Sequence, residues 1–108
     1  SEPMLAPGAP EAARDFWEEY PQVTDLEGIV ARIEAAGYEV LGHRPVVGAG
    51  WAGYYAQLSG RIATLRGQAD AALGAVLDAA EREISLWRAA PGDVAYALML
   101  VRPRLRAI

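Results

Sequence analysis

The sequence predicts an α+β domain with about four helices and a two-stranded antiparallel sheet. Apolar residues recur at helical spacing in several separate segments, whereas only residues 38–43 and 94–101 have the pattern of strands. The composition is that of a folded chain, since 53% of the 108 residues are hydrophobic and 22% are charged. Helices and strands are therefore both expected around one core.

The N-terminal segment, residues 1–10, is rich in proline and is predicted to be a flexible leader. A single α+β domain is then expected over 11–108. Its first helix is predicted to begin near Glu11 and to end at Tyr20, because Pro21 disfavours helical geometry in the residue before it.

A second helix is predicted by a capping box, in which the Thr24 and Glu27 side chains bond free backbone N–H groups at the helix start. Gly37 is positioned to end this helix in the left-handed conformation. The strand over 38–43 follows, and Pro45 is expected to mark its end. The apolar residues of the helix recur at helical spacing, namely Leu26, Ile29, Val30 and Ile33.

Two longer helices are predicted over 50–66 and 69–89, because the apolar repeat changes phase near Gly67. The last strand, 94–101, is apolar at both its odd-numbered and its even-numbered positions, which is typical of a strand covered on both faces. Two strands alone are marginal in water, and the chain offers this strand only 38–43 as a neighbour. We therefore expect a second copy of the chain or a missing segment to extend the sheet.

Composition also excludes several classes of function. The net charge of −4 argues against a nucleic-acid partner, and the absence of Cys excludes disulfides and thiol chemistry. With His43 as the only histidine, no histidine-based metal site is expected. No apolar stretch reaches the ~18 residues of a membrane span, so we expect a cytoplasmic protein without membrane association. Because the chain begins at Ser1 and not Met, we also expect it to be part of a longer protein.

A glycine motif offers an alternative site. Gly48, Gly50 and Gly53 match the G-x-G-x-x-G fingerprint, whose glycines let a dinucleotide pyrophosphate approach a helix N-terminus. The context argues against it, because only two apolar residues separate Pro45 from the first glycine and Trp51 puts a large ring near the phosphate position. Dinucleotide binding is therefore the less favoured hypothesis.

Several segments share a further pattern in their order and spacing: Asp15 to Pro21, Ile33 to His43, Trp51 with Tyr54 and Tyr55, Ile62 to Arg66, Asp78 to Trp87, and the final strand to Pro103. Together they resemble the C-terminal part of bacterial class I S-adenosylmethionine-dependent methyltransferases. The sequence departs from this pattern over 44–50, in the loop on the substrate side. In the fold that the resemblance implies, the last strand lies antiparallel between the fifth and the sixth.

The cofactor site of these methyltransferases lies in their N-terminal half, which nothing in this chain matches. The resemblance therefore implies that S-adenosylmethionine is the cofactor of the full-length protein. This chain would supply substrate-side and structural elements, and we expect it neither to bind the cofactor nor to catalyse alone.

The resemblance also implies a role for side chains near strand and helix ends, where α/β folds place substrates. Aromatic faces can hold a flat or cationic methyl acceptor, and His43 is a candidate to take a proton during transfer. Trp17 and Tyr55 fit equally well as core residues, and His43 as a structural one. The candidates for binding a small-molecule acceptor are Trp17, Tyr20, His43, Trp51, Tyr54 and Tyr55.

A stand-alone interaction module is the alternative function. In this hypothesis, the helices over 50–89 and the free edge of the last strand mediate pairing with a second copy of the chain. The partner is thus either another copy, giving a homodimer, or the missing N-terminal half.

Overall fold

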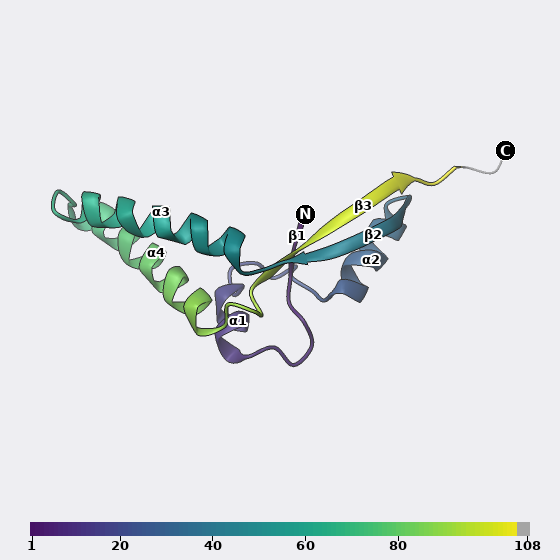
Figure 1. Ribbon diagram of the computed structural model, residues 1–108, viewed down its shortest axis with the longest axis horizontal. Coiled ribbons are helices and arrows are strands. Elements are labelled where there is room, and N and C mark those ends of the chain that lie inside the picture. The colour runs from purple at the N-terminus through teal and green to yellow at the C-terminus, as the bar shows by residue number, and fades with distance from the viewer. Residues whose placement is uncertain (106–108) are drawn as a thin grey trace.

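The computed structural model describes residues 1–105 and confirms the α+β class, with four helices and a three-stranded sheet. The last residues of the predicted domain, 106–108, lie outside the described residues. In chain order the elements are β1 (Glu2–Met4), α1 (Glu11–Phe16), α2 (Leu26–Ala35), β2 (Tyr38–Val46), α3 (Ala49–Arg66), α4 (Ala71–Ala89) and β3 (Ala95–Pro103) (Figure 1).

The molecule is long and narrow, with extents of 63 × 28 × 25 Å and a radius of gyration of 17.4 Å. A compact domain of this length has a radius of gyration of about 13 Å. In Figure 1, α3 and α4 extend to one side as a helical arm, and the ribbon of β2 and β3 extends with α2 to the other. The accessible surface is 7347 Å², whereas a compact monomer of 11.6 kDa exposes about 5,800 Å². The elongated shape leaves extra surface in contact with solvent.

The first helix is shorter than predicted. It ends at Phe16 and not at Tyr20, and the chain then turns tightly, with the Tyr20 N–H donating to the Trp17 carbonyl over 2.8 Å. The bond from the Glu18 N–H to the Asp15 carbonyl spans only three residues. These short-range bonds replace the last helical turn, and the Trp17 side chain enters the core.

The second helix occurs as predicted, but its N-cap is Asp25 and not Thr24. The Asp25 carboxylate accepts a hydrogen bond from the Gly28 N–H over 2.8 Å. The Thr24 backbone instead pairs with the N-terminal segment, because its carbonyl accepts from the Leu5 N–H over 3.0 Å. Gly37 has a φ of +92°, which confirms the left-handed helix end.

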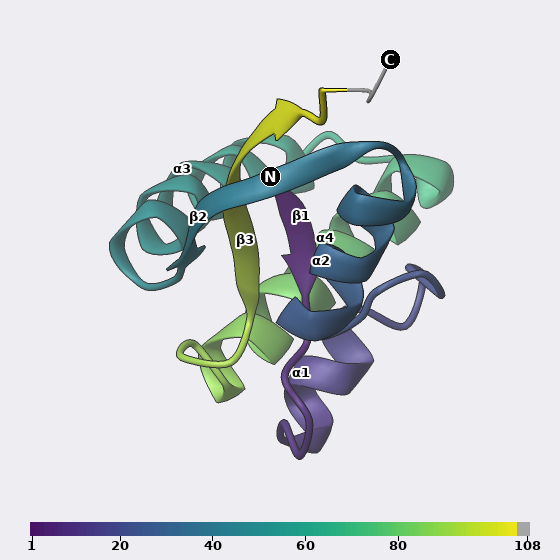
Figure 2. The same ribbon diagram turned by 90° about the vertical axis from the view of Figure 1, so that its right-hand side faces the viewer.

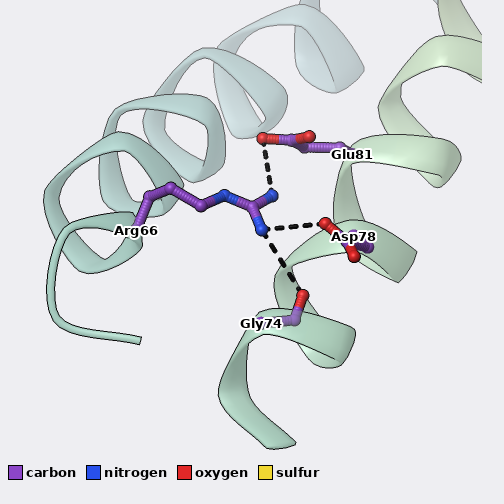
Figure 3. A network of polar contacts seen from close by, with 4 residues as sticks. All are labelled: Arg66, Gly74, Asp78 and Glu81. Atoms are coloured by element: carbon purple, nitrogen blue, oxygen red, sulfur yellow. Dashed lines mark hydrogen bonds and ion pairs between the residues drawn. The ribbon is translucent and has the colours of Figure 1, made fainter. Parts of the chain in front are cut away.

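The helical arm consists of two helices, as the change of phase near Gly67 predicts. Asp70 caps α4 by accepting from the Leu73 N–H over 2.8 Å. Figure 3 shows how Arg66, at the end of α3, reaches across the turn to α4. Its guanidinium lies 2.8 Å from Asp78 and 2.9 Å from Glu81, so the two helices are tied together near their connection.

The sheet has one strand more than predicted, because the N-terminal segment is not a free leader. Glu2–Met4 forms β1 and pairs antiparallel with β3, with Glu2 opposite Ala97 and Met4 opposite Ala95. Figure 2 shows β1 beside β3. Proline is tolerated at sheet edges, so the proline-rich composition that excluded a helix did not exclude an edge strand.

The strand order is β1-β3-β2, and both pairings are antiparallel. The expectation that the last strand has a single neighbour from its own chain is therefore wrong at Ala95–Ala97. It holds for residues 98–103, which pair only with β2. The predicted end of the earlier strand at Pro45 is also wrong, since β2 continues to Val46. β2 is an edge strand, where proline's missing N–H is not needed by a further neighbour.

The two faces of the sheet are covered differently. α2 lies over the face that carries Met99 and Val101, and Ile29 of α2 is buried. Leu98 and Leu100 alternate with these residues and are 43% and 64% exposed on the opposite face. The main core lies where α1, α3, α4 and the start of β3 meet, and includes Ala13, Trp17, Trp51, Tyr55, Ile62, Leu77, Ile84 and Val94.

None of the helices within residues 1–105 is both long and apolar enough to cross a membrane.

Candidate functional site

An aromatic cavity opens where the sheet meets the helical arm. Its volume is about 450 Å³, and α1, the turn that follows it, β2, α3, α4 and β3 all contribute side chains. We call it the aromatic cavity. Its lining residues are Phe16, Trp17, Tyr20, Val46, Gly50, Trp51, Tyr54, Tyr55, Glu83 and Tyr96.

Trp51 lies at the centre of the ring cluster, in the first turn of α3 just after the end of β2. Gly48 takes a φ of +75° between β2 and α3, a conformation that favours glycine. The Trp51 indole N–H then donates back to the Val46 carbonyl over 2.8 Å. Its ring stacks on Tyr96, with centroids 5.0 Å apart, and on Tyr55 at 6.1 Å. The turn geometry and these rings together hold the indole in one orientation.

Trp17 forms a second wall and is only 3% exposed. Its ring meets Trp51 and Tyr96 edge to face, with centroids 6.2 Å and 5.8 Å away. Tyr20 packs against the same indole at 5.3 Å. The Trp17 indole N–H is buried without an acceptor among residues 1–105. Trp17 is thus both a core residue and a lining residue, the two roles that the sequence left open.

Tyr55 and Glu83 supply the polar contact of the cavity. The Tyr55 hydroxyl donates to a Glu83 carboxylate oxygen over 3.0 Å. Burial, followed by the charge of Glu83, raises the pKa of Tyr55 well above its usual range, and burial also raises the pKa of Tyr96. Both hydroxyls are therefore protonated at neutral pH, and Tyr55 is a fixed donor to Glu83.

The cavity combines a buried floor with an exposed rim. Trp17, Trp51 and Tyr55 are buried, whereas Tyr20 and Tyr54 are 52% and 58% exposed. The rim rings can change rotamer without disturbing the core, while the floor is fixed by packing. Such an arrangement suits a small organic ligand that enters from solvent and stacks on the rim.

The structure brings together all but one of the predicted acceptor-binding residues. His43 lies elsewhere, because it pairs with Met99 on the face beneath α2, whereas Val46 pairs with Tyr96 at the aromatic cavity. Directly paired residues point to the same side of a sheet, and residues three apart on a strand point to opposite sides. His43 instead lines a separate cavity with Leu26. It cannot reach a ligand in the aromatic cavity.

Sequence reasoning missed four lining side chains. Phe16 stands beside Trp17 in the aromatic run, so its proximity was a signal in the sequence. Tyr96 is part of a strand expected to be wholly buried, and Val46 lies beyond the predicted strand end. Glu83 is one of several acids on α4 and carries no local signal, because only the packing of α4 against α3 brings it to Tyr55.

The alternative glycine site has part of the geometry that it requires. β2 is long enough to precede Gly48, and α3 begins at Ala49. The next strand, however, runs antiparallel to β2, whereas the dinucleotide fold needs a parallel β-α-β unit. Trp51 also covers the strand end through its bond to Val46. A Cβ at Gly50 or Gly53 would meet open space, so no close approach requires glycine there.

Within residues 1–105, no three Asp, Glu or His side chains are grouped so that they could hold a metal ion. No protein-family model matches the chain, and no curated protein or solved structure matches it either.

Proposed function

We propose that this chain is the C-terminal, substrate-side portion of an S-adenosylmethionine-dependent methyltransferase, and that the aromatic cavity receives the methyl acceptor. Under this proposal the full-length protein is an enzyme of the cytoplasm. The observation that carries the proposal is the strand order β1-β3-β2, with the last strand in the centre.

This order supports the resemblance noted in the sequence. In the fold that the resemblance implies, the last strand lies antiparallel between the fifth and the sixth. Here β3 lies antiparallel between β1 and β2. Because both neighbours run opposite to β3, they run parallel to each other, and α1 and α2 connect them across it. β1 thus corresponds to the end of the fifth strand and β2 to the sixth.

Within residues 1–105, the glycine-rich loop does not have the geometry of a cofactor site. The one glycine-rich loop, Gly48 to Gly53, follows a strand of antiparallel pairing and is covered by Trp51. We therefore assign S-adenosylmethionine to the N-terminal half implied by the resemblance. The role of this chain is to hold the acceptor by ring contacts and to orient it through Tyr55 and Glu83. His43 has no part in this proposal, because it lies on the other face of the sheet.

Calorimetric titration of S-adenosylmethionine tests the proposal. The open reading frame that contains this chain is expected to encode a strand, a glycine-rich loop and a helix upstream of Ser1, and its product is expected to bind the cofactor. The chain alone is expected to give no heat of binding. Micromolar binding by the chain alone, or an upstream sequence without these elements, would contradict the proposal.

A stand-alone homodimeric interaction module is the second candidate, and the exposure of Leu98 and Leu100 favours it. These leucines lie on the sheet face away from α2. A second copy that packs on them would reduce the extra surface of the elongated monomer. Sedimentation equilibrium is expected to detect a dimer that Leu100→Lys weakens. A strictly monomeric chain would exclude this candidate, and the upstream reading frame distinguishes it from the first.

A further inference from the structure

The aromatic cavity is negatively charged as well as aromatic. Among the described residues that line it, Glu83 is the only Asp or Glu, and none is Arg or His. Within residues 1–105, no cationic side chain forms an ion pair with Glu83. Arg82, the preceding residue in the chain, pairs with Glu18 over 2.8 Å. The carboxylate therefore has no counter-charge in the cavity.

The Glu83 carboxylate is also held in one orientation by Tyr55. One oxygen of Glu83 accepts the Tyr55 hydroxyl over 3.0 Å, whereas the other forms no hydrogen bond within the described residues. Tyr55 is 2% exposed and packs against Trp51, so it fixes the position of the acid. Tyr55 is accordingly a positioning residue, and the free carboxylate oxygen is available to a ligand.

The rings that line the cavity together with Glu83 favour the same sign of ligand charge. The face of an aromatic ring carries negative potential and attracts a cation within about 6 Å of its centroid. Tyr20 and Tyr54 are exposed at the rim, and Trp51 stacks on Tyr96 within the same cavity. An anion would be repelled by both the rings and Glu83, while a neutral ligand would gain only stacking and burial.

We propose that the aromatic cavity binds an organic cation, an ammonium group carried on a small organic body, with Glu83 as its counter-charge and the aromatic rings as its walls. The cation's role as methyl acceptor, or as its methylated product, rests on the proposed function. Its binding to this chain does not. The volume of about 450 Å³ limits the ligand to a small molecule.

The test compares choline with its neutral carbon isostere, 3,3-dimethylbutan-1-ol, by tryptophan fluorescence and by the NMR shift of the Trp51 indole N–H. The two probes have nearly the same shape and differ in charge. Choline is expected to bind about tenfold more tightly than the isostere. Glu83→Gln keeps an acceptor for the Tyr55 hydroxyl and is expected to remove most of this preference.

Two further variants test whether choline binding depends on the residues of the cavity or only on the net charge of the protein. Glu27→Gln makes the same change in net charge on α2, beside the other face of the sheet, and is expected to leave choline binding unchanged. Tyr54→Leu removes an exposed rim ring without emptying the core and is expected to weaken choline binding several-fold.

Equal affinity for the two probes overturns the inference, as does an unchanged preference in Glu83→Gln. The absence of any choline binding at millimolar concentration also overturns it. Each of these outcomes leaves cofactor binding by the full-length product unaffected. If the proposed function is wrong, the calorimetric titration of S-adenosylmethionine detects it, and cation binding by this chain is unaffected.

Discussion

The two halves of β3 show how strongly burial depends on neighbouring elements. At its start, Ala95 and Ala97 are buried, with β1 beside both residues and β2 beside Ala97. Beyond Ala97 the described part of the strand pairs only with β2, and Leu98 and Leu100 are exposed although they are more hydrophobic than the alanines. Both leucines also lie on the face away from α2, opposite to the alanines, so the covered face as well as the number of neighbouring strands sets their exposure.

The difference teaches that the stability of this chain is concentrated where the sheet meets the helical arm. Trp17, Trp51 and Tyr55 pack there with buried residues of α1 and α4, so each ring removes much apolar area from water. The far ribbon has α2 on one face and solvent on the other. Substitutions in these two regions are therefore expected to differ sharply in effect.

The largest contrast is expected between Trp51→Ala and Leu100→Ala. Trp51→Ala removes two stacked ring contacts and the bond to Val46, and is expected to lower the free energy of unfolding by about 3–5 kcal/mol. Leu100 is exposed, so its truncation is expected to change that free energy by less than about 0.5 kcal/mol. Urea denaturation measures both. Similar losses for the two variants would contradict the comparison.

Gly28→Ala tests how closely the first turn of α2 packs against Thr24, just before the helix. A Cβ at this position would lie 2.3 Å from the Thr24 hydroxyl oxygen, so the variant is expected to lose about 1–3 kcal/mol despite alanine's better helix propensity. Gly60→Ala in α3 is the matched control, because a Cβ there meets open space. This control is expected to gain about 0.5–1 kcal/mol in the same thermal or urea melts. Stabilisation by both substitutions would exclude the close contact with Thr24.

Substitutions at the start of α2 are expected to have a smaller effect on stability, and they distinguish Asp25 from Thr24 as the N-cap. Asp25→Ala removes the carboxylate that accepts the Gly28 N–H and is expected to cost about 1 kcal/mol. Thr24→Val preserves the side-chain shape and removes only the hydroxyl, so little change is expected. If the denaturation midpoints showed the reverse order, Thr24 would be the cap, as the sequence motif predicted.

The smallest expected effect is a loss of stability at alkaline pH. In the unfolded chain Tyr55 ionises near pH 10, whereas in the folded chain its pKa is raised by burial and by Glu83. The folded state then binds more protons than the unfolded state, so stability falls as pH rises above about 10. At about pH 10.5, Tyr55 is expected to contribute less than about 1 kcal/mol of this loss. The slope should be smaller in Tyr55→Phe, and equal slopes would show that Tyr55 titrates normally when folded.

The candidate site was only partly predictable from sequence. The aromatic residues just after α1 and on α3 were found because they stand near element ends, where ligands commonly bind. Glu83 joins Tyr55 from 28 residues away, a distance over which no local pattern extends. His43 was grouped with the rings because it was also expected near a strand end, but its side of the sheet is set by the pairing register with Met99.

The sequence by itself determined the helices and the existence of the two long strands, because capping residues, glycine ends and apolar periodicity act over a few neighbouring residues. Only the tertiary structure decided that Glu2–Met4 is a strand, since three residues gain that conformation solely from pairing with β3. It also decided which apolar residues are buried: Ala97 is buried and Leu100 is exposed because burial depends on which elements cover a position. Local signals specify conformation, whereas burial and site assembly come from contacts between residues far apart in the chain.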